Sequence, residues 1–185
     1  MKRLLASVLL GAVLASACGG SGGSGSGNDT AADALNRGLA AHAAGKLDDA
    51  VTAYFQTLAK DPKNKFALYN LGEIAQRQSR MQAAESYYRL ALEQDPKMES
   101  ALFNLAIVRT GAGASAEAVA LYRQVIAVDP NYAAAHFNLG LLLRQLGQTA
   151  DAQQELAAAQ RLDPKLVAPS PSATPLRQTS PSPRP

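Results

Sequence analysis

The chain has 185 residues and a formal net charge of +3, so it is long enough for one domain of ordinary size. The excess of basic residues comes from the two ends, at Lys2, Arg3, Lys165, Arg177 and Arg184. Because the middle of the chain is essentially neutral and carries no basic patch, we exclude a nucleic acid as its partner.

Residues 1–17 have the pattern of a signal peptide. Lys2 and Arg3 give the positive start, residues 4–14 form an apolar run, and small residues at 15–17 precede the only cysteine, Cys18. The apolar run is shorter than the roughly 20 residues that span a bilayer. We therefore expect a targeting segment and not a membrane-spanning helix.

Small residues directly before a lone cysteine resemble the bacterial lipobox, in which the cysteine receives lipid (palmitate included) and becomes the new N-terminus. Ala15 stands where that motif usually has Leu. The resemblance implies lipidation at Cys18, and the alternative is ordinary cleavage after Ala17, which leaves a free thiol. Because Gly19 and not Asp follows the cysteine, the resemblance implies the outer membrane, facing the periplasm. In an organism with a single membrane it implies the outer face of that membrane.

Residues 18–29 carry the cysteine and a linker, in which 19–27 are only Gly and Ser. Such a sequence is typical of a flexible tether with a span of about 15–20 Å. Thr30 and Asp33 then have the spacing of a capping box, which predicts that a helix begins here.

A dipeptide, Asp-Pro, recurs along the middle of the chain at intervals of 34 residues, at positions 61–62, 95–96, 129–130 and 163–164. A fixed period in this range is the mark of a solenoid. The repeat units are residues 31–64, 65–98, 99–132 and 133–164.

Each unit contains two apolar runs with helical spacing. In the second unit the first run is Leu68, Leu71, Gly72 and Ala75, and the second is Met81, Ala84, Tyr88, Ala91 and Leu92. Between the runs stands a small residue, in order Gly45, Ser79, Gly113 and Gly147. This is suited to the left-handed residue that ends a helix, and Asp-Pro ends the second helix.

Small residues also recur within the helices, at Gly38, Gly72, Ala106 and Gly140 in the first and Ala50, Ala84, Ala118 and Ala152 in the second. They allow the two helices to approach closely. Bulky residues beside them are expected to fill the remaining space: Tyr54, Tyr88, Tyr122 and, in the last unit, Leu156.

The Leu-x-x-Leu-Gly, Ala-x-x-x-aromatic and Pro signature, in four copies over residues 31–164, resembles the tetratricopeptide repeat. The resemblance implies an all-α solenoid of about eight antiparallel helices in a right-handed superhelix, which binds other proteins. The outer units depart from the signature at Arg37, Ala34 and His136, as is expected where one side lacks a neighbour.

The tail, residues 165–185, is rich in Pro and Ser, and we expect it to be disordered or partly polyproline-like. The simplest role for this tail is a passive spacer, and the alternatives are contact with peptidoglycan or glycosylation.

Nothing in the sequence indicates catalysis, a metal or a cofactor. His42 and His136 lie in different repeats with no Cys or acidic residue at ligand spacing, so we expect no metal site. Asp48 and Asp49 stand at the start of a helix, where the helix dipole favours acidic residues. No nucleophile motif is present. We predict that the protein is not an enzyme.

In tetratricopeptide proteins the first helices line a concave groove, and the resemblance therefore implies a peptide-binding surface here. Asn recurs once on each first helix, next to an aromatic residue in units two to four. An amide both donates and accepts hydrogen bonds, so a row of them suits the backbone of an extended peptide. The alternative is that these Asn side chains serve contacts between helices. The predicted groove residues are Asn36, Tyr69, Asn70, Glu73, Arg77, Phe103, Asn104, Phe137 and Asn138.

Together these patterns predict a lipid-anchored scaffold in the cell envelope, which binds peptide segments of envelope proteins and assists assembly or recruitment of a complex. The alternative is a structural subunit that self-associates end to end through its last helix, residues 150–162.

Overall fold

The structure is a computed structural model that describes residues 29–168 and contains, within them, eight α-helices and no strand. The predicted signal peptide, Cys18 with nearly all of its linker, and most of the predicted tail lie outside the described residues. The helices are α1 (Ala31–Ala43), α2 (Leu47–Lys60), α3 (Lys65–Arg77), α4 (Met81–Gln94), α5 (Glu99–Gly111), α6 (Ser115–Val128), α7 (Ala133–Gln145) and α8 (Thr149–Leu162).

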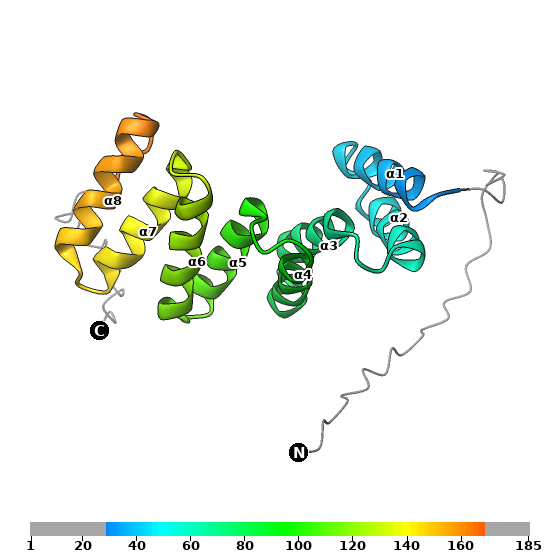
Figure 1. Cartoon of the computed structure of the whole chain (residues 1–185), viewed down its shortest axis with the longest axis horizontal. Helices are drawn as coiled ribbons and strands as arrows, with labels where there is room; N and C mark the ends of the chain where they lie inside the picture. Colours follow the sequence, from blue (N-terminus) through cyan, green and yellow to red (C-terminus); the bar gives the residue numbers. More distant parts are fainter. Residues whose placement is uncertain (1–28, 169–185) are drawn as a thin grey trace, which may run out of the picture.

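The helices pack as four consecutive pairs, and each pair packs against the next. Figure 1 shows these pairs following one another along the long axis, from α1 and α2 at one end to α7 and α8 at the other. The expected all-α solenoid is confirmed. The first helix of each pair begins at the residue from which the 34-residue period is counted: Ala31, Lys65, Glu99 and Ala133.

Each first helix ends in the same left-handed turn. The small residue expected there has a positive φ in every unit, 74° at Gly45, 58° at Ser79, 75° at Gly113 and 77° at Gly147. The next amide donates across the turn to a carbonyl five residues back, as from Arg80 N to Ala75 O at 2.9 Å, which is a Schellman motif. This turn reverses the chain within a few residues and so makes the helix pair compact.

Each second helix ends at the Asp of the Asp-Pro dipeptide, and the Asp side chain takes part in the turn that follows. Its carboxylate accepts a hydrogen bond from the amide two residues later, at distances of 2.9–3.3 Å in the four units. Its backbone carbonyl accepts a second one from the amide three residues later. The Asp thus forms an Asx turn while the following proline prevents the helix from continuing.

In the first two pairs, the close approach between the helices is a contact between a glycine and a tyrosine ring. A Cβ at Gly38 or Gly72 lies 2.5 Å from Cε1 of Tyr54 or Tyr88, closer than carbon atoms pack. In the last pair a Cβ at Gly140 lies 2.7 Å from Cγ of Leu156. The rings of Tyr54 and Tyr88 are fully buried, so the predicted role of the small positions is correct, and the glycines accommodate aromatic side chains.

The buried side chains form a row along the solenoid. Tyr54 joins Leu71 and Ile74 of the next unit in one cluster, and Tyr88 joins Leu105 of the unit after it in another. Because each tyrosine packs against its own pair and against the next, the core is built from contacts between neighbours.

The N-terminal end of the solenoid is polar. Arg37, at the place of the buried Leu71, pairs with Asp29 through two hydrogen bonds of 2.7 and 2.8 Å. The ammonium group of Lys60 also donates to the backbone carbonyl of Asp29. Asp29 is therefore held against the first pair of helices.

The C-terminal end is polar as well. Gln153, Glu155 and Gln160 of α8 stand one repeat after Val119, Leu121 and Ile126 of α6, which pack in the core. His136, 9% exposed, takes the packing position that its place in the repeat predicts. Its Nδ1 lies 2.6 Å from Glu155 Oε2 and its Nε2 lies 3.1 Å from the Pro130 carbonyl oxygen.

A closed set of ion pairs connects the two middle units. Glu85 and Arg89 lie on α4, Arg109 on α5 and Glu117 on α6, and each Arg contacts both Glu side chains at 2.5–2.9 Å. The set is electrically neutral and uses its four charges internally.

Among residues 29–168, no helix combines the length and the hydrophobicity that a membrane crossing requires.

Replacing Gly72 with Ala is expected to destabilise the fold by about 1–3 kcal/mol, because the added methyl group meets a buried ring that has no free space. Gly111→Ala is the matched control: a Cβ there meets nothing within 4 Å. Urea unfolding followed by circular dichroism measures both variants. Equal stability of the two would contradict the assigned contact.

Candidate functional site

Two hollows in the surface are related by the repeat and lie between consecutive first helices. The first, of about 490 Å³ between α1 and α3, is lined by Leu39, His42, Ala43, Gly45 and Arg77. The second, of about 290 Å³ between α5 and α7, is lined by Ile107, Thr110, Tyr122, Asn138, Leu141, Leu142 and Gln145. We refer to them as the N-terminal pocket and the C-terminal pocket.

The two pockets use the same positions with different chemistry. Ile107 and Thr110 stand two repeats after Leu39 and His42, and Gln145 stands two repeats after Arg77. The N-terminal pocket thus carries two nitrogen-rich side chains where the C-terminal pocket carries neutral ones. A repeated backbone therefore presents two binding environments on the face formed by the first helices.

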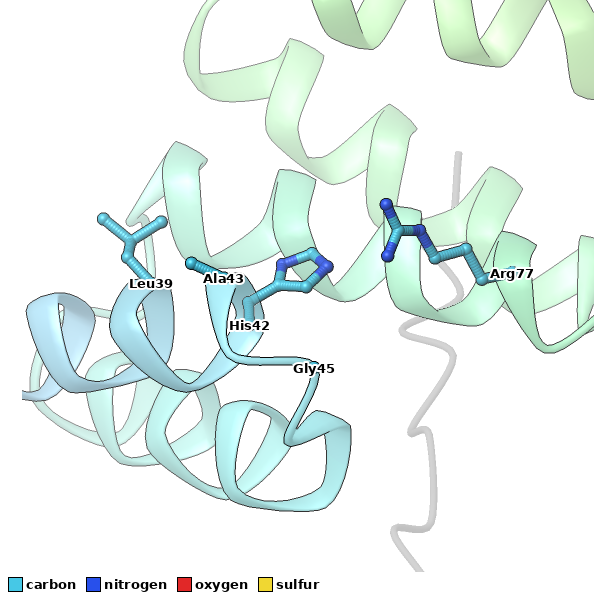
Figure 2. Close-up of a pocket in the computed structure, with 5 residues that line it drawn as sticks. All are labelled: Leu39, His42, Ala43, Gly45 and Arg77. Carbon is cyan, nitrogen blue, oxygen red and sulfur yellow. The ribbon is translucent and has the colours of Figure 1, made fainter.

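His42 is held by its neighbours through one ring nitrogen. Its Nδ1 lies 3.3 Å from Asn70 Oδ1 and 3.4 Å from the Tyr54 hydroxyl oxygen. Figure 2 shows the imidazole ring and the guanidinium group of Arg77 extending toward the same space between α1 and α3. Neither Leu39 nor Ala43 crosses that space.

The predicted asparagines of the first helices differ in their exposure and in their hydrogen bonds. Asn36 is exposed, whereas Asn70 is 8% exposed, and its Nδ2 donates to the Phe66 carbonyl oxygen at 2.8 Å. Asn104 Nδ2 donates to the Tyr69 hydroxyl of the preceding unit at 3.2 Å. Asn70 contacts His42 of α1, and Asn104 contacts Tyr69 of α3. In this structure both side chains therefore serve contacts between helices, the alternative that the sequence leaves open.

Asn138 differs from these because it lines the C-terminal pocket. Burial raises the pKa of the Tyr122 hydroxyl, and the polar side chains of Thr110 and Asn138 oppose that rise. The Asn138 side chain is half-buried and reaches the pocket beside Leu141.

The predicted aromatic residues are half-buried, and two of them, Tyr69 and Phe103, pack on other aromatic rings. Tyr69 lies with its ring centroid 5.9 Å from that of Tyr88. Phe103 lies 6.0 Å from Tyr122 and 5.0 Å from Tyr132. Phe137 is half-buried on α7. The rings of Tyr69 and Phe103 therefore connect the first helices to the second helices.

The charge of Glu73 influences three tyrosines. Burial and, second to it, the charge of Glu73 raise the pKa of Tyr54 and of Tyr69 to about 12, and the same causes raise the pKa of Tyr88. The charge of Glu73 therefore acts on hydroxyl groups from α2, α3 and α4. Within the described residues, Glu73 forms no ion pair with Arg77 on the next turn of α3.

The sequence analysis identified Arg77 and Asn138 as groove residues but did not include Leu39, His42, Ile107 and Leu141. The 34-residue period could have identified three of these residues. Leu39, Ile107 and Leu141 stand in their units at the position that Glu73, a predicted groove residue, has in the second unit. Across residues 29–168, no three His, Cys, Asp or Glu side chains converge as metal ligands.

Comparison with protein families identifies the repeat. Models of the tetratricopeptide repeat match residues 31–99 and 133–166, and a model of the TPR repeat matches residues 112–147. No curated protein matches the sequence.

Solved structures share the fold. The crystal structure of MamA is 21% identical and covers 75% of this chain and 81% of its own, with a TM-score of 0.69. MamA from Desulfovibrio magneticus is 17% identical over 75% of this chain and 78% of its own, with a TM-score of 0.66. A tetratricopeptide repeat protein from Parabacteroides merdae is 26% identical over 73% of this chain and 54% of its own, with a TM-score of 0.66.

The raised tyrosine pKa values predict a loss of stability in alkali. A phenol whose pKa is about 12 in the folded chain and about 10 when unfolded contributes stability that is complete below pH 10. This contribution is lost as the pH rises toward 12. Urea unfolding and phenolate absorbance over this range measure it. Glu73→Gln is expected to move phenolate formation to lower pH, and ionisation of Tyr54 and Tyr69 near pH 10 in the native protein would contradict the assignment.

Proposed function

Because the chain belongs to the tetratricopeptide-repeat family, we propose that it is a scaffold that binds extended peptide segments of other proteins on the face formed by α1, α3, α5 and α7. The observation that carries the proposal is the pair of repeat-related pockets on this face. Their shared positions suit one ligand that runs along the solenoid and contacts successive units.

The groove in this proposal differs in part from the one that the sequence predicts. Asn36, Tyr69, Glu73, Arg77, Phe103, Phe137 and Asn138 remain in it, joined by Leu39, His42, Ile107 and Leu141. Asn70 and Asn104 contribute by fixing the helices, because their amides already have partners. Binding therefore depends on side-chain pockets more than on a row of free amides.

The proposal includes a membrane anchor at Cys18. The signal-peptide pattern of residues 1–17, the small residues before the cysteine and the Gly/Ser linker support it. Such an anchor holds the groove near the envelope, on the outer membrane facing the periplasm, and raises the effective concentration of partners there. Assistance to the assembly of an envelope complex follows from that placement.

End-to-end self-association, the alternative function, is less well supported. Gln153, Glu155 and Gln160 place polar groups on α8 where an additional unit needs apolar ones, and Arg37 does so at the other end. A scaffold that acts as a single solenoid fits these surfaces better.

Photo-crosslinking in cells tests the groove. A benzophenone amino acid replaces Leu39 on α1, which is 42% exposed, or Phe55 on α2, which is 49% exposed and serves as the matched control. We expect the Leu39 variant to capture one envelope protein that the Phe55 variant does not. Equal capture from both positions, or capture of a second copy of the chain alone, would contradict the proposal.

The anchor is tested separately by Cys18→Ser. We expect wild-type protein to incorporate labelled palmitate and to sediment with membranes, and the variant to do neither. Membrane association that survives this substitution would contradict lipidation at Cys18.

A further inference from the structure

The guanidinium group of Arg77 has no hydrogen-bond or ion-pair partner within the described residues. Other arginines of the solenoid are engaged: Arg37 pairs with Asp29, and Arg89 and Arg109 pair with Glu85 and Glu117. A guanidinium group carries a permanent charge and five donors in a geometry that matches a carboxylate. Arg77 presents these donors on the binding face.

His42 supplies a second nitrogen at the same place. Its Nδ1 lies near Asn70 Oδ1 and the Tyr54 hydroxyl, which holds the ring in place. When Nδ1 accepts from the Tyr54 hydroxyl, the ring proton is on Nε2, which has no partner among residues 29–168 and can donate to a ligand. Figure 2 shows the ring directed toward Arg77 across the N-terminal pocket. Two side chains from consecutive first helices therefore face one small volume.

Among the described residues, the lining of this pocket includes no acidic side chain. Glu73, one turn before Arg77 on α3, forms no ion pair with it, and the charge of Glu73 contributes to the raised pKa values of Tyr54, Tyr69 and Tyr88. Asp49, from the start of α2, lines a different hollow together with Arg37. The pocket thus offers a ligand a guanidinium group that has no ion-pair partner among residues 29–168.

We infer that the N-terminal pocket binds the side-chain carboxylate of an Asp or Glu within an extended peptide, through Arg77 and His42. This inference rests on the proposed peptide-binding function. Of the three other lining residues, Ala43 and Gly45 are small, which leaves room for the peptide to continue past the carboxylate. An internal acidic residue therefore fits the pocket as the ligand group.

The C-terminal pocket is expected to bind a second side chain of the same peptide. Ile107 and Leu141 are half-buried at its mouth, and it contains no charged side chain, so it suits an aliphatic or aromatic side chain. The two pockets are separated by two steps between first helices, on the order of 20 Å in total. An extended peptide covers that distance in about six residues. The ligand is an acidic residue and an apolar residue separated by about six positions.

An array of random dodecapeptides probed with the purified solenoid tests the inference. We expect Asp and Glu to be enriched about six positions from an apolar residue. The strongest peptide is then synthesised with its acidic residue as Glu or Gln, and with a free or an amidated C-terminus. We expect Glu→Gln to weaken binding at least about tenfold, since a charge-assisted hydrogen bond is lost, and amidation to have no effect.

Protein variants identify the site. In Arg77→Gln the Glu and Gln peptides are expected to bind equally, which assigns the carboxylate to Arg77 in a double-mutant cycle. Arg123→Gln is the matched control, because it removes the same charge from an exposed position on α6. We expect it to leave the tenfold preference intact. Circular dichroism confirms that each variant is folded.

Each other outcome overturns the inference. Equal binding of Glu and Gln peptides to the wild type, or an equal effect of Arg77→Gln and Arg123→Gln, rejects the site. A preference abolished by amidation assigns the carboxylate to the peptide C-terminus and rejects an internal residue. Loss of affinity in Leu141→Ala with no acidic preference retains the groove and rejects only the carboxylate. Absence of any binding peptide rejects the inference, and the photo-crosslink from Leu39 then decides the proposed function alone.

Discussion

In the first two pairs, a tyrosine ring lying against a glycine sets the distance between the two helices. Side chains of ordinary size at Gly38 or Gly72 cannot share that space with Tyr54 or Tyr88, whose rings are fully buried. The same rings contact residues of the following unit, so one contact holds a pair together and also positions its neighbour. The angle between units, and with it the placement of the first helices, depends on how this ring is seated.

The fold was predictable from the sequence because it is determined by local and repeated interactions. The Asp-Pro period fixed the start of each first helix, and the small residue at Ser79 or Gly113 fixed the reversal between helices. The Asx turn at each Asp is a detail that the dipeptide indicated only as a helix end. Chain reversals of this kind are encoded within a few residues, which makes them accessible to pattern analysis.

The candidate site was only partly predictable, because it depends on which side chains satisfy one another across units. The Asn pattern on the first helices is regular, yet Asn70 is occupied by His42 and Phe66, and Asn104 by Tyr69. Conversely, Leu39, Ile107 and Leu141 look like ordinary apolar residues of a helix and lie on the surface that forms the pockets. Whether a polar group is free for a ligand is a property of the packed structure, and the sequence alone does not contain it.

The polar residues at the two ends have a consequence for the length of the molecule. The polar exceptions to the repeat lie on the outer faces of the two end units: Arg37, Gln153, Glu155 and Gln160. The two middle units contact their neighbours through the same set of positions. The number of units is therefore a property of the terminal surfaces and not of the internal junctions. A second copy of residues 65–98 inserted after residue 98 would contact, on both sides, surfaces of the kind that already join neighbouring units. Duplication of this segment is accordingly a simple route by which such a chain acquires a longer groove with an additional pocket.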